Sequence, residues 1–225
     1  MANASTTGFG FVPVMALGNT PATSGQSKYK IKSGLGIAIC QNDPVSLQNS
    51  SGDEGYVQDA SPATADDGST GGASYDVDAS PVASPALIGV FNGAFYVAST
   101  TNKPTWANNV AASTSFAANP NTDANSTDGF AFVNDNPFQE YICKADAAVT
   151  IASTGFRMNC NNNTLASAVS GQSVATLNVA ADNDGYMFRL LRSAEDPENN
   201  DVSAAGCNFV VVASARANLF LSSAV

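Results

Sequence analysis

Short runs in which apolar and polar residues alternate recur along the chain, and they predict β-strands. Residues 28–32 read Lys-Tyr-Lys-Ile-Lys, a period of two that places the three lysines on one face of a strand. Turn residues such as Asn134-Asp135-Asn136-Pro137 separate the later runs. Further strands are expected at residues 35–39, from residue 45, and at 130–133, 138–144, 148–151, 174–179, 186–191 and 209–213. This spacing predicts an all-β fold, a barrel or sandwich of short antiparallel strands with long loops.

One apolar stretch, residues 86–98, contains the pair Asn92-Gly93. An Asn-Gly pair between apolar β-formers is the strongest short signal for a two-residue hairpin, because both residues can adopt positive φ. We therefore expect two strands joined by a type I′ turn at Asn92-Gly93.

The first 27 residues differ from the rest, since they are mostly Ala, Asn, Ser, Thr, Gly and Pro and carry no charged side chain. Such a segment cannot form a core of its own. We expect an extended arm that lies across its own surface or a neighbour's and is ordered only in an oligomer or on a partner. Its expected contact residues are the spaced apolar side chains Phe9, Phe11, Val12, Val14 and Leu17. Residues 28–225 are then a single β-rich domain, with a polar acidic insertion at about residues 49–85.

The charge balance narrows the possible partners. The 225 residues include 9 Lys and Arg against 19 Asp and Glu, a formal net charge of −10 at pH 7. Affinity for phosphate comes from basic side chains that displace counterions, so nucleic acid and anionic membranes are not expected as partners. The first 27 residues lack the basic segment and apolar run of a secretory signal, and no run approaches the ~18 apolar residues of a membrane span. Synthesis and assembly in a cytoplasm are expected.

Composition also bears on catalysis. The chain has no histidine, which removes Ser-His and Cys-His nucleophile pairs, histidine general bases and histidine-bound metals. The acidic residues at 195–198 lie in one loop rather than on two sides of a cleft. The cysteines lack the close-spaced pairs of zinc sites, and we interpret them mainly as buried reduced thiols, with a disulfide as the alternative. They are Cys40, Cys143, Cys160 and Cys207. No catalytic residue, bound metal or cofactor is expected, and the chain is predicted not to be an enzyme.

Two features have competing interpretations. The row Lys28, Lys30 and Lys32 is either a solvated edge that protects a strand from aggregation or a contact row for an acidic partner. The single tryptophan, Trp106, is either a packing anchor or a ligand platform. For carbohydrate binding, Trp106 with Tyr96 is the only candidate aromatic pair that the sequence offers.

Several blocks of the chain resemble, in order, the motifs of one known protein family. Residues 8–14, Gly-Phe-Gly-Phe-Val-Pro-Val, resemble that family's GFRP-type opening, although Val12 stands where arginine is common. Residues 28–44 resemble its next strand pair, which closes on GDPV where this chain has Asn-Asp-Pro-Val at 42–45. Residues 87–91 resemble its central GVF hairpin. The closing strand–loop–strand is matched by residues 188–191, 196–201 and 209–212, whereas the acidic segment 49–85 has no counterpart.

The family that these blocks resemble is one of tailed-phage virion proteins. Its members are usually head structural proteins, often decoration (cement) proteins of the capsid. The resemblance implies a non-catalytic virion protein on the outer capsid surface, assembled in a bacterial cytoplasm, that bridges neighbouring major capsid protein subunits. The arm would contact the capsid, and the lysine row an acidic patch on the capsid protein or on another copy. A homotrimer at threefold positions is preferred because three subunits meet there, with a dimer as the alternative. An acidic body with an uncharged arm suits such a surface.

Other functions remain open at this point. A tail, fibre or head–tail protein is one, although fibres usually show repeats and none is visible. A carbohydrate-binding adhesive β-module is another, and an enzyme is a third that no group of residues supports.

Overall fold

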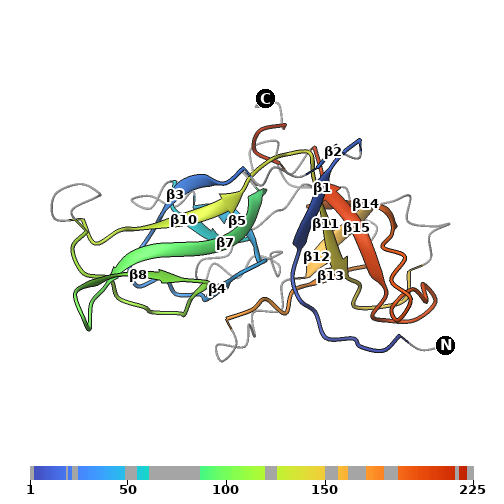
Figure 1. Ribbon diagram of the computed structural model, residues 1–225, viewed down its shortest axis with the longest axis horizontal. Helices are drawn as coiled ribbons and strands as arrows, with labels where there is room; N and C mark the ends of the chain where they lie inside the picture. The colour runs from blue at the N-terminus through green and yellow to red at the C-terminus, as the bar shows by residue number, and fades with distance from the viewer. Residues whose placement is uncertain are drawn as a thin grey trace, which may run out of the picture.

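The computed structural model describes residues 3–18, 20–21, 25–48, 55–60, 87–119, 126–149, 157–161, 171–179, 187–215 and 218–221. Within these ranges every regular element is a β-strand, and every pair of named strands is antiparallel, so the all-β prediction is confirmed. The strands form two larger sheets that lie at opposite ends of the molecule's longest axis (Figure 1). Both sheets are open, so the described strands form no closed barrel. This part of the chain contains no helix that could span a membrane.

The seven-stranded sheet, here called the terminal sheet, combines the first strands of the chain with the last ones. Its strand order is β13-β12-β14-β15-β11-β1-β2. The strands are β1 (Val12–Ala16), β2 (Thr20–Pro21), β11 (Gln139–Lys144), β12 (Arg157–Asn161), β13 (Thr176–Asn178), β14 (Phe188–Ser193) and β15 (Asn208–Ala213).

The other large sheet, here called the central sheet, has the order β3-β10-β7-β5-β6, and β8 also pairs with β7. Its strands are β3 (Ser27–Ile31), β5 (Pro44–Leu47), β6 (Val57–Asp59), β7 (Leu87–Ala98), β8 (Lys103–Ala107) and β10 (Gly129–Asn134). A small third sheet pairs β4 (Ile39–Cys40) with β9 (Asn109–Val110). An isolated bridge between Lys30 and Tyr56 brings the start of β6 beside the edge strand β3.

Each large sheet has its own apolar core. The core of the terminal sheet is rich in aromatic and β-branched side chains, among them Phe11, Tyr141, Phe188, Phe209 and Val211. The core of the central sheet includes inward residues of β3, β7 and β10 together with Ile39 and Val110 of the small sheet. Strand β7 contributes to both cores, because Leu87 and Val90 belong to the first and Ile88 and Phe91 to the second.

The expected N-terminal arm has a place in the protein's own fold. Residues 12–16 form β1, which pairs with β11 and β2, and Phe11 is fully buried. Two glycines allow this docking, because their backbone comes very close to neighbouring segments. A methyl group on Gly8 would lie 2.2 Å from the carbonyl oxygen of Val174, and one on Gly10 would lie 2.5 Å from that of Asn42. A segment with few apolar residues can therefore be ordered by backbone packing around one large side chain.

The Asn92-Gly93 hairpin predicted from the sequence is wrong. Strand β7 runs without a break through this pair, and its register with β10 skips Asn92, which is a β-bulge. The strand continues because β7 is paired on both sides, with β10 along residues 90–95 and with β5 and β8 on the other edge. Gly93 takes a φ of +148°, and the Asn92 side chain accepts a hydrogen bond from Nε2 of Gln41 at 3.0 Å.

Other boundaries differ in smaller ways. Residues 36–37 form a bend, and only Ile39–Cys40 is a strand there. Residues 148–149 are not a strand, and residues 150–151 of that prediction lie outside the described residues. The segment 49–85, expected to be an insertion, contributes β6 to the central sheet; its residues 49–54 and 61–85 lie outside the described residues. Strand β8 forms at residues 103–107, where the sequence pattern predicted no strand.

Candidate functional site

The predicted lysine row lies on β3, at the edge of the central sheet. Lys28 and Lys30 are exposed on its outer face, and Lys32 follows the strand and is half-buried. The ammonium of Lys28 lies over the ring of Phe130, 4.1 Å from its centroid, which is a cation–π contact. Nζ of Lys30 lies 3.8 Å from a carboxylate oxygen of Asp128. The lysines therefore contact side chains of their own domain and are held against the sheet.

Aromatic side chains share this outer face with the lysines. The strand register aligns one residue from each of four neighbouring strands, since Trp106 of β8 pairs with Phe95 of β7, which pairs with Phe130 of β10, which pairs with Lys30 of β3. Paired residues of adjacent strands point to the same side of a sheet. We call this outer surface, with Phe132 and Lys28 from the next pairing row, the aromatic–lysine face.

Trp106 occupies a specific position on the aromatic–lysine face. Its indole lies over Gly93, where a methyl group would be 2.6 Å from Cζ2, and its ring centroid is 5.0 Å from that of Phe132. The side chain is nevertheless 51% exposed. The absence of a side chain at Gly93 thus makes room for an indole that covers the sheet and keeps about half of its surface open to solvent.

The pairing of Trp106 with Tyr96 that the sequence offered is wrong. Tyr96 follows Phe95 in β7, so its side chain points to the opposite side of the sheet. There it packs against the core of the central sheet and stacks on Phe116, with 4.4 Å between ring centroids. Phe132 is the aromatic neighbour of Trp106 instead.

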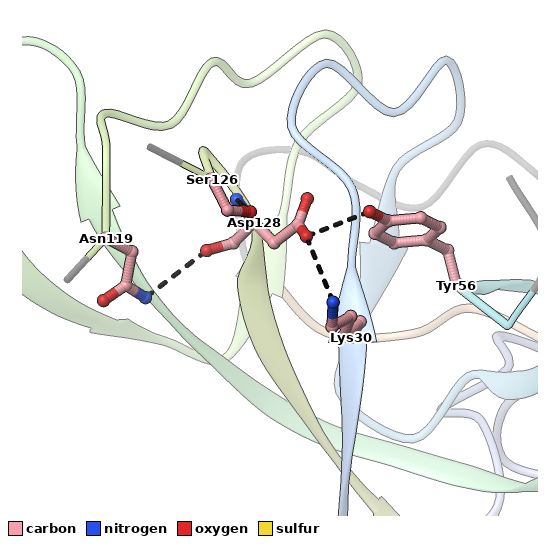
Figure 2. Close-up of polar contacts among 5 residues, drawn as sticks. All are labelled: Lys30, Tyr56, Asn119, Ser126 and Asp128. Atoms are coloured by element: carbon pink, nitrogen blue, oxygen red, sulfur yellow. Dashed lines mark hydrogen bonds and ion pairs between the residues drawn. The ribbon is translucent and has the colours of Figure 1, made fainter. Parts of the chain in front are cut away.

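A buried acid fixes the position of Lys30. Figure 2 shows the carboxylate of Asp128 between Lys30 and Tyr56, whose hydroxyl donates a hydrogen bond of 2.9 Å to Oδ2. The backbone amide of Asp128 donates to Oγ of Ser126 at 3.1 Å, and its carbonyl accepts from Nδ2 of Asn119 at 3.3 Å. The carboxylate therefore joins β3, β10 and the start of β6 at the basic end of the face.

The predicted arm residues lie elsewhere, on the terminal sheet (Figure 1). Phe11 is in the core and is not available to a partner, whereas Val12 and Val14 are half-buried in β1. Phe9 is half-buried, with its ring 5.8 Å from Nζ of Lys144. Leu17 is 40% exposed. The arm residues and the lysine row thus belong to two separate surfaces.

Leu17 belongs to a second set of exposed apolar side chains. Its backbone amide donates a hydrogen bond of 2.8 Å to the carbonyl of Phe138, and Phe138 is also exposed. The C-terminal residues Leu219, Phe220 and Leu221 are exposed as well, and the amide of Leu219 donates a hydrogen bond of 3.2 Å to the carbonyl of Leu87 at the start of β7. We call these five residues the apolar edge.

No catalytic arrangement is visible in the described part of the chain. Burial, with Asp43 and Asp59 nearby, raises the pKa of Cys40 to about 11, and burial also raises the pKa of Cys143 and Cys207. Thiols with raised pKa values are poor nucleophiles. All three are free cysteines, and the described residues contain no group of three or more Cys, Asp or Glu side chains that could hold a metal ion.

Sequence reasoning missed Phe95, Phe130 and Phe132 as parts of a site. A signal was present in β10, where Gly-Phe-Ala-Phe-Val-Asn has apolar residues on both faces although only one face can contact the core. Comparisons with protein-family models, with curated proteins and with solved structures gave no match. The function is therefore argued from the residues and their geometry.

Proposed function

We propose that this chain is a non-catalytic virion structural protein that decorates the outer surface of a phage icosahedral capsid and bridges neighbouring major capsid protein subunits. The observation that carries the proposal is that the blocks with family resemblance, scattered along the sequence, contact one another in the fold.

The opening and closing blocks meet in the terminal sheet. Phe11 of the opening block stacks on Phe188 of the closing block, with 4.2 Å between ring centroids. The loop at 196–201 forms hydrogen bonds with the residues that precede the opening block. Asn3 donates to the carbonyl of Asp201 at 3.0 Å, and its own Oδ1 accepts from the amide of Asp201 at 2.9 Å.

The two middle blocks meet in the central sheet. The amide of Asn42 donates to the carbonyl of Phe91 at 2.8 Å, and the amide of Phe91 donates to the carbonyl of Asp43 at 2.9 Å. Val45 is then opposite Gly89 in the β5–β7 pair. The resembling blocks thus pair directly with one another in β5–β7 of the central sheet and in β14–β15 of the terminal sheet.

The apolar edge is the candidate capsid contact. Exposed apolar side chains are candidates for an interaction surface, because their burial against a partner is favourable. Leu17, the arm residue that is clearly exposed, belongs to this edge. We propose the major capsid protein as the partner. A homotrimer at threefold positions remains the preferred assembly, with a dimer as the alternative.

The experiment is cryo-EM of virus particles purified from the natural source of the gene, after mass spectrometry has established that the chain is present. We expect density for this fold on the outer shell, with the apolar edge facing the major capsid protein. Replacing Leu17 and Phe138 together by serine should lower occupancy, and the matched control Trp106→Ser, an exposed aromatic of the other sheet, should not. Absence of the chain from the particles, or its presence only in the tail, would overturn the proposal.

A further inference from the structure

We propose that the aromatic–lysine face is a binding site for an oligosaccharide that carries a carboxylate group. The inference rests on the geometry of the central sheet and is independent of the role on a capsid. The surface involved is also distinct from the apolar edge.

The aromatic part of the face suits stacking of sugar rings. One side of a pyranose ring presents C–H groups, which are attracted to the electron-rich face of an aromatic ring. Trp106, Phe95 and Phe130 lie in one pairing row across three neighbouring strands. Adjacent strands are about 4.8 Å apart, a spacing comparable to the length of one sugar unit. An oligosaccharide that crosses the strands along this row would therefore stack on Trp106 and Phe95 and then meet the ammonium of Lys28, which lies over the ring of Phe130.

The solvent exposure of the aromatic side chains in this row indicates that a ligand binds there. The solvent-facing side of an antiparallel sheet normally carries polar side chains. Here Trp106 is half exposed, and Phe95, Phe130 and Phe132 are only half-buried. Gly93 is needed for this arrangement, since a side chain there would collide with the indole. The aromatic surface is thus a specific arrangement rather than a scattered set of exposed side chains.

The lysines make the β3 end of the row positively charged. This end carries Lys28 and Lys30, with Lys28 against Phe130 and Lys30 oriented by Asp128. A carboxylate on the sugar at this end would receive hydrogen bonds from the ammonium groups. A nucleic acid would bring a phosphate at every nucleotide toward a chain of net charge −10, which is unfavourable. The charge pattern favours a ligand with stacking rings and few anionic groups.

The single tryptophan of the chain makes the test direct, because Trp106 is the only indole fluorophore. The full chain is titrated with glucuronoxylotriose, a xylotriose that carries one glucuronate, and with 3′-sialyllactose, and the emission of Trp106 is recorded. Xylotriose and lactose are the neutral matched probes. We expect a saturable change with at least one acidic probe and a weaker affinity for its neutral counterpart.

Three variants separate stacking from charge, with calorimetry as the readout where the fluorophore is removed. Trp106→Ala should weaken binding of the acidic probe by about tenfold or more. Lys28→Gln combined with Lys30→Gln should weaken it about threefold and leave the neutral probe unaffected. Phe138→Ala, an exposed aromatic of the apolar edge, is the control and should bind like the unaltered chain.

The inference is overturned if neither acidic probe saturates, if Trp106→Ala binds as well as the unaltered chain, or if the neutral probes bind equally well. Displacement of the sugar by a polyglutamate peptide or by oligothymidylate at lower concentration would also overturn it. That result would assign the face to a different polyanion. Because the apolar edge and the particle are not involved, failure here is distinguishable from failure of the proposed capsid role.

Discussion

The rings of Phe11 and Phe188 stack with 4.2 Å between their centroids and 12° between their planes, so that the first and the last part of the chain share one contact. Both side chains are fully buried, and the ring of Tyr141 meets Phe188 edge-on at 6.2 Å. The N-terminal segment is therefore part of the core of the terminal sheet, and its contribution to stability can be measured.

Phe11→Ala should destabilise the fold by about 3–5 kcal/mol, because it removes a fully buried aromatic ring and leaves a cavity against Phe188. The free energy of unfolding from urea titration is the measurement. Phe9→Ala is the matched control, because Phe9 is only half-buried, and it should cost clearly less. Equal stability of Phe11→Ala and the unaltered chain would mean that the N-terminal segment leaves the sheet in solution, as expected for an arm ordered only on a partner.

Gly10→Ala should cost about 2–4 kcal/mol. Gly10 has a φ of +79°, which disfavours any L side chain, and an added methyl group would also lie 2.5 Å from the carbonyl oxygen of Asn42. Gly18→Ala is a matched control, because Gly18 has a φ of +85° but no atom within 4 Å of the added methyl. It should therefore cost only the conformational strain, about 1 kcal/mol. Thermal unfolding of both variants separates close packing from strain, and similar losses would contradict the packing argument.

Gly93→Ala should displace the indole of Trp106 from the central sheet. The added methyl would be 2.6 Å from Cζ2, and the φ of +148° adds strain of about 1–3 kcal/mol. The tryptophan emission should shift to longer wavelength, since the ring becomes more solvated. Gly36→Ala, at a position with open space around the added methyl, should leave the emission unchanged. An unshifted spectrum for Gly93→Ala would show that the indole does not depend on this glycine.

Because Asp43 is buried, its contribution to the free energy of unfolding depends on pH. Burial raises the pKa of its carboxyl from 3.8 to about 6, although the amide of Cys40, which donates to Oδ2 at 2.7 Å, acts in the opposite direction. The folded state thus holds this proton more tightly than the unfolded state. The stabilisation from Asp43 is fully present below pH 3.8 and is lost as the pH rises through about 6.

Asp43→Asn should therefore gain stability relative to the unaltered chain as the pH rises, because the amide carries no charge to bury. A shift of this size corresponds to a change of about 3 kcal/mol between the two limits. The measurement is the difference in unfolding free energy between the two proteins at several pH values from 4 to 8. A difference that does not change over this interval would contradict the assignment.

The alternation of apolar and polar residues was sufficient to predict the all-β class and strands close to β3, β5, β10, β11, β14 and β15. Strand β3 has one face against a core, and its burial leaves a period of two in the sequence. Strands β11 and β15 are buried along nearly their whole length and appear instead as short apolar runs between turn residues. Strand β1 lacks this signal, because its flanking glycines, rather than a row of apolar side chains, allow it to dock. Its place depends on segments around residues 42 and 174, which a local pattern cannot indicate.

The site was predicted only in part. The lysine row and Trp106 were identified separately, but their proximity depends on the order of β8, β7, β10 and β3, and strand order is not a local property of the sequence. Tyr96 was chosen as the partner of Trp106, whereas the strand alternation directs it to the opposite side of the sheet. The pair Asn92-Gly93 shows the same limit. Its local sequence predicts a hairpin, but pairing on both sides of β7 keeps the strand continuous and places a β-bulge at this pair.

Strand β7 supplies side chains to both cores, with Leu87 and Val90 in one and Ile88 and Phe91 in the other. Neither core can lose its order without removing support from this strand, and hence from the other core. We expect the two sheets to melt in a single calorimetric transition, although they look like separate halves. A protein that unfolds in this way resists partial opening, so force applied at either sheet would be shared across the whole molecule.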